Sequence, residues 1–350
     1  MSEVGSYVSE KINVSKLRLE NYISTENMIS NRGGISLATK LPSVKTTTAF
    51  QKGDILISNI RPYFKKIWLA DKSGGCSNDV LVIRSDSNFS NRFLYYVLSS
   101  DTFFDYAVST SKGTKMPRGD KSSIMKYTVP LFSLEEQELI SDILKSYDEK
   151  IQLNKQINHH LEQIGTIIWQ ERFNNQVPNG VLGDIASISS GKRPPIKTTE
   201  STDDVKIPII GASSIMGYTD KILYNHKILV TGRVGTHGII QRYQRSCWPS
   251  DNTLVLQSDF YEFVYQVLKH IDFKSLNRGS TQPLITQTDL NKSELYIPSI
   301  SELLDFETVV GTHMKQYEQN NLENEILFAL RDTLLPKLLS GEITINQAAK

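Results

Sequence analysis

Residues 54–58 read DILIS, and a closely similar stretch returns as KILVT at residues 227–231, shifted by 173 positions. Three more segments recur in the same order at shifts of 173, 166 and 168 positions: SNDVLV at 77–82 as SDNTLV at 250–255, GTKMP at 113–117 as GSTQP at 279–283, and VP at 129–130 as IP at 297–298. Any one match could arise by chance. Four matches in the same order, at shifts that differ by only a few residues, indicate a tandem duplication.

Each copy opens with a globular part of mixed secondary structure. Strands are predicted from short runs of β-branched residues at 54–60, 79–84, 227–231 and 252–257. Helices are predicted within 91–108 and 259–273, where aromatic and aliphatic residues recur at helical spacing. The predicted fold class is therefore α+β in both copies.

A long helix follows each globular part. The first opens with Ser133 and Glu136, three residues apart, which is a capping-box pattern. Its apolar residues then recur at intervals of four and three: Ile140, Leu144, Tyr147 and Ile151, and again Leu161 and Ile168. The second helix runs from Glu302 through Phe306, Val310, Tyr317, Leu327 and Leu334. Pro336 and Gly341 are expected to mark its end. Stripes of about forty residues predict a coiled-coil seam.

Asparagines interrupt both stripes in the middle. Asn154 and Asn158 lie in the first helix, and Asn320, Asn321 and Asn324 lie in the second. A buried Asn at a seam costs stability but fixes register and orientation, whereas an Asn turned to solvent does neither. The sequence leaves both alternatives open.

These segments predict four parts: a globular domain at 1–132, a spacer helix at 133–174, a second globular domain at 175–298 and a C-terminal spacer helix at 299–342. Two helices in one chain pair most simply as an antiparallel coiled coil. That pairing would put one domain at each end of a rod about 60 Å long. Successive turns of the DNA major groove are about 34 Å apart, so such a rod could set the two domains over separate sites.

Charge is distributed unevenly along a chain whose net charge is only +1. Residues 1–130 hold 18 Lys and Arg against 11 Asp and Glu, and residues 175–298 hold 13 against 11. The helical segments 131–174 and 299–342 are acidic, with 4 against 8 and 3 against 8. This alternation favours nucleic-acid contact by the domains, although solvated helices are often Glu-rich for no other reason.

Several function classes have no motif in the chain. No apolar run is long enough for a transmembrane helix, and the start lacks the apolar core of a secretory signal. Cys76 and Cys247 have no CxxC spacing, and His159, His160 and His237 lack the spacing or partners of a zinc or nucleophile site. The sequence also has no GxxxxGK[ST] phosphate loop and no Asn/Asp-Pro-Pro-aromatic motif. We therefore expect a cytoplasmic, non-catalytic chain with no metal or cofactor of its own.

The order of these segments resembles the specificity (S) subunit of type I DNA restriction–modification systems. The matching segments are GDILIS at 53–58, GTKMPRGD at 113–120, VP at 129–130 before LEEQ at 134–137, LGDI at 182–185, SSGKRP at 189–194, GSTQP at 279–283 and LLPKLLSGEI at 334–343. Each motif is moderately specific, but their order and duplication are highly specific. One departure is ISELL at 300–304, where the first helix has LEEQ, and it could weaken the symmetry of the two helices.

The resemblance implies that the two domains are target-recognition domains, which read a bipartite, asymmetric site in double-stranded DNA. It also implies that two modification (M) subunits dock on the paired helices. Those subunits would carry S-adenosylmethionine and methylate adenine, and restriction (R) subunits would join them. Two other readings remain: a non-catalytic coiled-coil scaffold that binds proteins, and a methyltransferase or nuclease with degenerate motifs.

Candidate DNA-contacting residues are donors and cations in loops that follow strands. In the first domain they are Asn59, Arg61, Tyr63, Lys65, Lys66, Lys112, Lys115, Arg118 and Lys121. In the second domain they are Lys192, Arg193, Arg233, His237, Gln241, Arg242, Arg245, Arg278, Thr281 and Gln282. For any single cation, an ordinary solvated surface role is the alternative.

Overall fold

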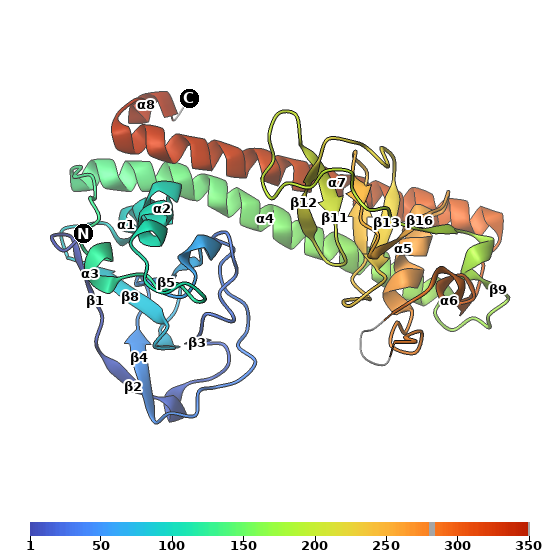
Figure 1. Cartoon of the computed structure of the whole chain (residues 1–350), viewed down its shortest axis with the longest axis horizontal. Coiled ribbons are helices and arrows are strands. Elements are labelled where there is room, and N and C mark those ends of the chain that lie inside the picture. Colours follow the sequence, from blue (N-terminus) through green and yellow to red (C-terminus); the bar gives the residue numbers. More distant parts are fainter. Residues whose placement is uncertain (280–283, 349–350) are drawn as a thin grey trace. The chain divides into compact units, whose positions relative to one another are not determined.

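The computed structural model describes residues 1–279 and 284–348, which form two compact units. Unit 1 comprises Met1–Leu153 and Glu323–Lys350, and unit 2 comprises Asn154–Leu322. Two long helices, α4 (Leu134–Phe173) and α7 (Ile300–Ser340), contribute residues to both units (Figure 1). Each unit therefore contains one globular domain and a part of each long helix.

The globular domains have the mixed composition that the sequence predicts. Unit 1 holds β1 (Gly5–Tyr7), β2 (Lys11–Asn13), η1 (Val14–Lys16), β3 (Tyr22–Ile23), β4 (Thr46–Phe50), β5 (Ile55–Ser58), η2 (Pro62–Phe64), β6 (Ile67–Leu69), β7 (Gly74–Cys76), β8 (Val80–Ser85), α1 (Asn91–Ser99), α2 (Asp101–Ser109), α3 (Lys121–Ile124) and α8 (Ile345–Ala348). Unit 2 holds β9 (Gly180–Val181), η3 (Leu182–Asp184), β10 (Ser187–Ser190), β11 (Ile207–Ile210), β12 (Ile215–Thr219), β13 (Ile228–Gly232), β14 (Gln241–Tyr243), β15 (Trp248–Pro249), β16 (Thr253–Gln257), α5 (Tyr261–His270), α6 (Gln287–Asn291) and β17 (Glu294–Leu295).

The two domains repeat one sheet topology. The order β1-β8-β5-β6 in unit 1 matches β10-β16-β13-β14 in unit 2, and all neighbouring strands in both sheets are antiparallel. A parallel pair also recurs, β3 with β7 and β11 with β15. After these pairs the Ser77 amide donates to the Ile23 carbonyl at 2.8 Å, and the Ser250 amide donates to the Ile210 carbonyl at 2.9 Å. The duplication inferred from sequence is thus present in the backbone.

The strand register corrects one detail of the repeat. Ser58 pairs with Val80, and Gly232 pairs with Thr253. Val80 and Thr253 are equivalent in the repeat, at a shift of 173 positions. The residues that pair with them, Ser58 and Gly232, are therefore equivalent as well, and these two are 174 positions apart. The match of DILIS with KILVT is therefore one residue out of register. All four residues of β5 are buried, so the strand has no apolar–polar alternation that could fix its register from sequence.

The first long helix begins where the capping pattern predicts, and the second begins with a capping box that the sequence analysis did not identify. Glu136 accepts hydrogen bonds from the Ser133 amide and hydroxyl, both at 2.8 Å, and the Glu136 amide donates to the Ser133 hydroxyl. Ser299 and Glu302 form the same capping box on α7, with the amide donating to the carboxylate at 2.9 Å. The different sequence at 300–304 therefore leaves the helix start unchanged.

The end of α7 differs from the expectation in one respect. Pro336 lies inside the helix, which continues to Ser340. The helix ends at Gly341, whose φ of 73° is left-handed and whose amide donates to the Leu338 carbonyl. Gly341 alone provides the stop, because a left-handed residue terminates a helix, whereas a proline within it removes only one backbone donor.

The two helices pair in antiparallel fashion. The seam residues Asn154, Asn158, Asn320 and Asn324 are buried, whereas Asn321 is half-buried. In unit 1 the Arg331 guanidinium on α7 contacts Asp148 on α4 at 2.7 Å. In unit 2 the Asn158 amide group donates to Asn321 Oδ1 at 2.9 Å, and the Asn320 amide group donates to Asn158 Oδ1 at 2.8 Å. The alternative of solvent-exposed asparagines is wrong for Asn158 and Asn320, which are 6% and 4% exposed.

Both helices also complete the cores of the domains. In unit 1, Ile140 and Leu335 belong to the same buried cluster as Phe93 of α1. In unit 2, Phe173 and Phe306 pack edge-on against each other and against Phe263 of α5. The helices therefore contribute to the core of each domain. The boundaries at residues 132/133 and 298/299 stay a prediction.

A further helix–domain contact in unit 2 involves a buried carboxyl group. Glu307 on α7 accepts hydrogen bonds from the backbone amides of Phe263 and Glu262 at 2.8 and 3.2 Å, at the start of α5. Burial raises the pKa of Glu307 to about 7, against the lowering effect of those two amides. The carboxyl group caps the first turn of α5 and joins that helix to α7.

The buried asparagine contact in unit 2 generates a stability prediction. Replacing Asn158→Ala leaves the Asn320 amide group without its acceptor in a buried seam, which should lower the free energy of unfolding by about 1–3 kcal/mol. Denaturant unfolding measures this change. Gln156→Ala, on the exposed side of the same helix, is the matched control and should change stability by less than about 0.5 kcal/mol. Equal effects of the two substitutions would contradict the buried contact.

Candidate nucleic-acid interface

Two loops that the sequence singled out in the first domain meet at one surface. The first follows β5, and the second comprises residues 112–120. The Gly119 amide donates to the Asn59 carbonyl at 3.0 Å, and the Arg61 amide donates to the Pro117 carbonyl at 2.8 Å. A Cβ at Gly119 would lie only 2.9 Å from Asn59 Oδ1, so glycine permits this close approach. These contacts bring the two predicted clusters together.

The first loop turns sharply and presents an aromatic pair. Arg61 and Lys65 flank η2 with left-handed φ values of 50° each. Between them Tyr63 and Phe64 are exposed, with ring centroids 4.8 Å apart. Left-handed backbone is costly for residues other than glycine, and it is found mostly where function or a specific contact requires it. The turn directs two rings outward at the end of β5.

The cations of this first loop are largely occupied by protein acceptors. Lys65 contacts Asp101 at 2.6 Å, and Lys66 donates to the Thr25 carbonyl at 2.7 Å. Burial lowers the pKa of Lys66. Asn59 is itself buried at 8% exposure. These three residues are therefore better placed to hold the loop than to reach outward.

The second loop is the more exposed one. Lys112 and Arg118 pair through two backbone hydrogen bonds of 2.9 Å, which close the loop between them. Their side chains are 80% and 56% exposed and contact Asp120 and Asp79, respectively. Lys115 at the loop tip is exposed, and within the described part of the chain no carboxylate pairs with it. Lys121 is exposed at the start of α3.

Unit 2 repeats this backbone frame at the equivalent strand end. The Arg233 amide donates to the Asn252 carbonyl at 2.8 Å, as the Asn59 amide does to the Asp79 carbonyl at 2.8 Å. The Ile285 amide donates to the Arg233 carbonyl at 2.9 Å, and thus corresponds to Gly119. The frame is the same, but the side chains that it carries differ.

The other predicted residues of unit 2 occupy varied positions. Lys192, Arg193 and Arg245 are exposed, and Arg278 is 69% exposed while it contacts Asp289. His237 is half-buried and its Nδ1 lies 2.9 Å from the Gly235 carbonyl oxygen. The remaining predicted residues are Gln241, whose side chain donates to the Gly211 carbonyl at 2.8 Å, and Thr281 and Gln282, which lie outside the described residues.

Arg242 does not belong to this surface, which corrects the expectation for it. Its side chain is 5% exposed and forms a two-pronged ion pair with Glu262 at 2.7 and 2.8 Å. The guanidinium also lies over the rings of Tyr261 and Tyr265, 5.0 and 4.6 Å from their centroids. It therefore joins β14 to α5 inside unit 2, where nucleic acid has no access.

The sequence-based search missed Arg32. Its guanidinium contacts Asp101, the same carboxylate that holds Lys65. The Asn31 and Arg32 amides donate to the Phe64 and Lys65 carbonyls, both at 2.9 Å, so this loop supports the exposed aromatic pair. The stretch NRGG at 31–34 indicates a turn, but nothing in it predicts this partner.

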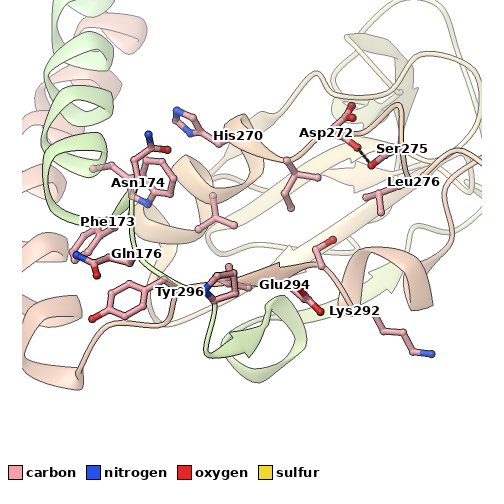
Figure 2. A pocket seen from close by; sticks show the side chains of 16 residues that line it. Phe173, Asn174, Gln176, His270, Asp272, Ser275, Leu276, Lys292, Glu294 and Tyr296 are labelled. Carbon is pink, nitrogen blue, oxygen red and sulfur yellow. Dashed lines mark hydrogen bonds between the residues drawn. The ribbon is translucent and has the colours of Figure 1, made fainter.

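A cavity of about 530 Å³ in unit 2 lies where α4 and α5 end. Figure 2 shows Phe173 and Asn174 on one side of it and Asp272 and Leu276 on the other, with Tyr296 below. None of the described residues that line it is a predicted contact residue. The predicted contact residues among the described part of the chain therefore lie outside this cavity.

Two further features bear on function. Within residues 1–279 and 284–348, no cluster of His, Cys, Asp or Glu side chains could hold a metal ion. Among the same residues, no helix has both the length and the apolar character needed to span a bilayer.

The chain thus contains two α+β domains of one sheet topology, each with loops at the equivalent strand end, as in a protein that recognises its target through two domains. The chain belongs to the family of type I restriction modification DNA specificity domains, whose family model matches residues 9–163 and 177–332. The match covers both domains, with the greater part of both long helices. The resemblance inferred from the sequence is confirmed, and the chain is a DNA specificity protein of a type I restriction–modification system.

Named relatives agree over nearly the full length. The chain is 22% identical to the specificity subunit of type I restriction enzyme MjaIX of Methanocaldococcus jannaschii, covering 94% of this chain and 86% of the relative. It is 22% identical to the HindI specificity subunit of Haemophilus influenzae, covering 98% of each. Its fold is similar to the crystal structure of the type I S subunit from M. genitalium, with a TM-score of 0.50 and 17% identity over 94% of this chain and 95% of that one.

The burial of Arg242 generates a second prediction. Arg242→Ala leaves Glu262 as an uncompensated buried charge, so it should lower the free energy of unfolding by about 3–5 kcal/mol. Urea unfolding measures the change. Lys192→Ala, which removes an exposed cation from the same domain, should leave stability within about 0.5 kcal/mol of wild type. If the Arg242→Ala protein has normal stability but impaired DNA binding, Arg242 contacts DNA and this account of it is wrong.

Proposed function

We propose that this chain reads a bipartite, asymmetric DNA target in the cytoplasm, with each domain contacting one half of the site. The observation that carries this proposal is the repeated backbone frame with different side chains. At equivalent positions of this frame, the exposed Arg118 of unit 1 is replaced by the half-buried Leu284 of unit 2, and Lys112 is replaced by Arg278. A frame that is constant while its side chains vary would present two different sets of donors to two different base sequences.

The exposed side chains divide into two kinds of contact. Lys115, Arg118 and Lys121 in unit 1, and Lys192 and Arg193 in unit 2, are exposed cations suited to phosphate. Such contacts position a protein on DNA but carry no sequence information. In unit 1 the exposed aromatic pair at the end of β5 offers apolar contact in a groove. Discrimination between bases would then come from the loop side chains that differ between the domains.

The long helices are suited to a different partner. On α4 the residues Leu139, Leu153 and Ile167 recur at multiples of seven positions and are 46%, 51% and 51% exposed. On α7, Leu322, Ile326 and Leu330 are 49%, 54% and 44% exposed at intervals of four. Apolar stripes at helical spacing on exposed faces favour docking of partner helices. We assign these faces to two methyltransferase subunits.

In this proposal the chemistry resides in the partners. The methyltransferase subunits would bind S-adenosylmethionine and methylate adenine, and restriction subunits would join the complex for cleavage. The family is one of recognition domains, in agreement with a chain that selects the DNA site and takes no part in methyl transfer. The two helices would set the distance between the two half-sites.

Exchange of one domain tests the proposal. Replacing residues 1–130 with the corresponding domain of another specificity protein should change one half of the methylated sequence and leave the other half unchanged, because each domain has its own frame. Genome-wide mapping of methylated adenines, with and without the chain, is the measurement. A change in both halves would contradict modular reading, and methylation without sequence preference would favour a scaffold that binds proteins.

A further inference from the structure

The same kind of ion pair occurs in the second loop of both domains. In unit 1, Lys112 contacts the carboxylate of Asp120, and in unit 2, Arg278 contacts the carboxylate of Asp289. The cations are 80% and 69% exposed, whereas the acids are only 12% and 7% exposed. In each domain an outward-facing cation is therefore paired with a carboxylate fixed within the protein.

The two cations are equivalent in the backbone, but the two acids are not. The Lys112 amide donates to the Arg118 carbonyl at 2.9 Å, and the Arg278 amide donates to the Leu284 carbonyl at 3.0 Å, at one place in the repeat. Asp120, however, is the N-cap of α3, whereas Asp289 lies inside the first turn of α6. Different positions on the short helix thus provide a carboxylate for the same cation. This recurrence points to the pairing itself as the shared feature.

Both carboxylates are held in place by other hydrogen bonds. Asp120 accepts from the Ser123 amide at 2.9 Å and from the Ser122 hydroxyl, and Asp289 accepts from the Thr286 hydroxyl at 2.6 Å. The Lys112 ammonium holds the pKa of Asp120 well below its usual range, and the Thr286 hydroxyl and the Arg278 guanidinium lower that of Asp289. The acids therefore remain ionised near neutral pH, while the long cationic side chains can move.

We propose that Asp120 and Asp289 compete with DNA phosphates for Lys112 and Arg278. This inference rests on the proposed function, because it takes both cations as phosphate contacts. In the free protein each cation is neutralised by its internal carboxylate. On binding, a backbone phosphate replaces that carboxylate, so part of each new contact is offset by the ion pair that is lost. An ion pair whose cation is this exposed is weak enough to exchange. Asp120 and Asp289 are thus positioning residues that lower the affinity of the protein for the DNA backbone.

Two single substitutions test the proposal, in the full chain assembled with its methyltransferase partners. Asp120→Asn and Asp289→Asn remove the charge, and Asn remains a good N-cap at position 120. Each should tighten DNA binding about two- to fivefold, the size of one exposed ion pair. The slope of log affinity against log salt should stay nearly the same, because the same phosphates are contacted with either residue. The gain should be equal for target and random DNA, because phosphates carry no sequence information.

The controls separate the ion pair from a general change of charge. Asp71→Asn removes one negative charge at an exposed carboxylate with no ion-pair partner among the described residues, and it should leave DNA affinity close to that of wild type. Lys112→Ala combined with Asp120→Asn should abolish the gain. Equal effects of Asp120→Asn and Asp71→Asn, or a gain that survives without Lys112, would overturn the competition. A wild-type complex that does not prefer its methylated sequence over random DNA would instead contradict the proposed function.

Discussion

The antiparallel pairing of α4 and α7 is the constraint on which the rest of the structure depends. In unit 2 it is fixed by the buried amide of Asn158, which bonds across the seam to the buried amide of Asn320 and the half-buried amide of Asn321. Apolar residues alone would tolerate a shift along such a seam, whereas paired amides tolerate only one register. Because both helices enter both cores, the register of the seam also determines how each domain is completed.

The duplicated frame explains how one chain can carry two different binding surfaces. Backbone hydrogen bonds, which do not depend on side-chain identity, hold the end of β5 against the second loop in unit 1 and repeat at β13 in unit 2. Exposed side chains around this frame, such as Lys112 and Arg118, can then diverge without disturbing the backbone contacts. Recognition can therefore change at one domain while the helices and the other domain remain as they are.

Much of this organisation could be predicted from the sequence, because repeats and helical stripes are periodic over long stretches. The bounds of α4, Leu134–Phe173, lie within one residue of the predicted 133–174 at each end. The register of β5 could not be predicted, since a strand buried on both faces has no alternation to read. The sequence around Arg242 likewise has no pattern that separates a buried arginine from the exposed cations near it.

The sequence predicted which loops carry the candidate site, but it did not predict which residues contact one another there. The glycines and cations of residues 112–121 indicated an exposed basic loop, and the structure places it against the end of β5. The partners of those cations come from distant sequence, as with Asp101, which holds both Arg32 and Lys65. Such pairings depend on the tertiary fold and leave no local signal. Thr281 and Gln282 stay predictions.

In our proposal, the helix pair sets the gap between the two half-sites that the two domains read. Inserting seven residues in both α4 and α7 preserves the seam pattern and adds roughly 10 Å to each helix, equal to about three base pairs of DNA. Sequencing of methylated adenines in cells that carry this variant is the most direct measurement. We predict unchanged half-site sequences separated by a longer gap. Methylation of the original site with its original gap would contradict the account.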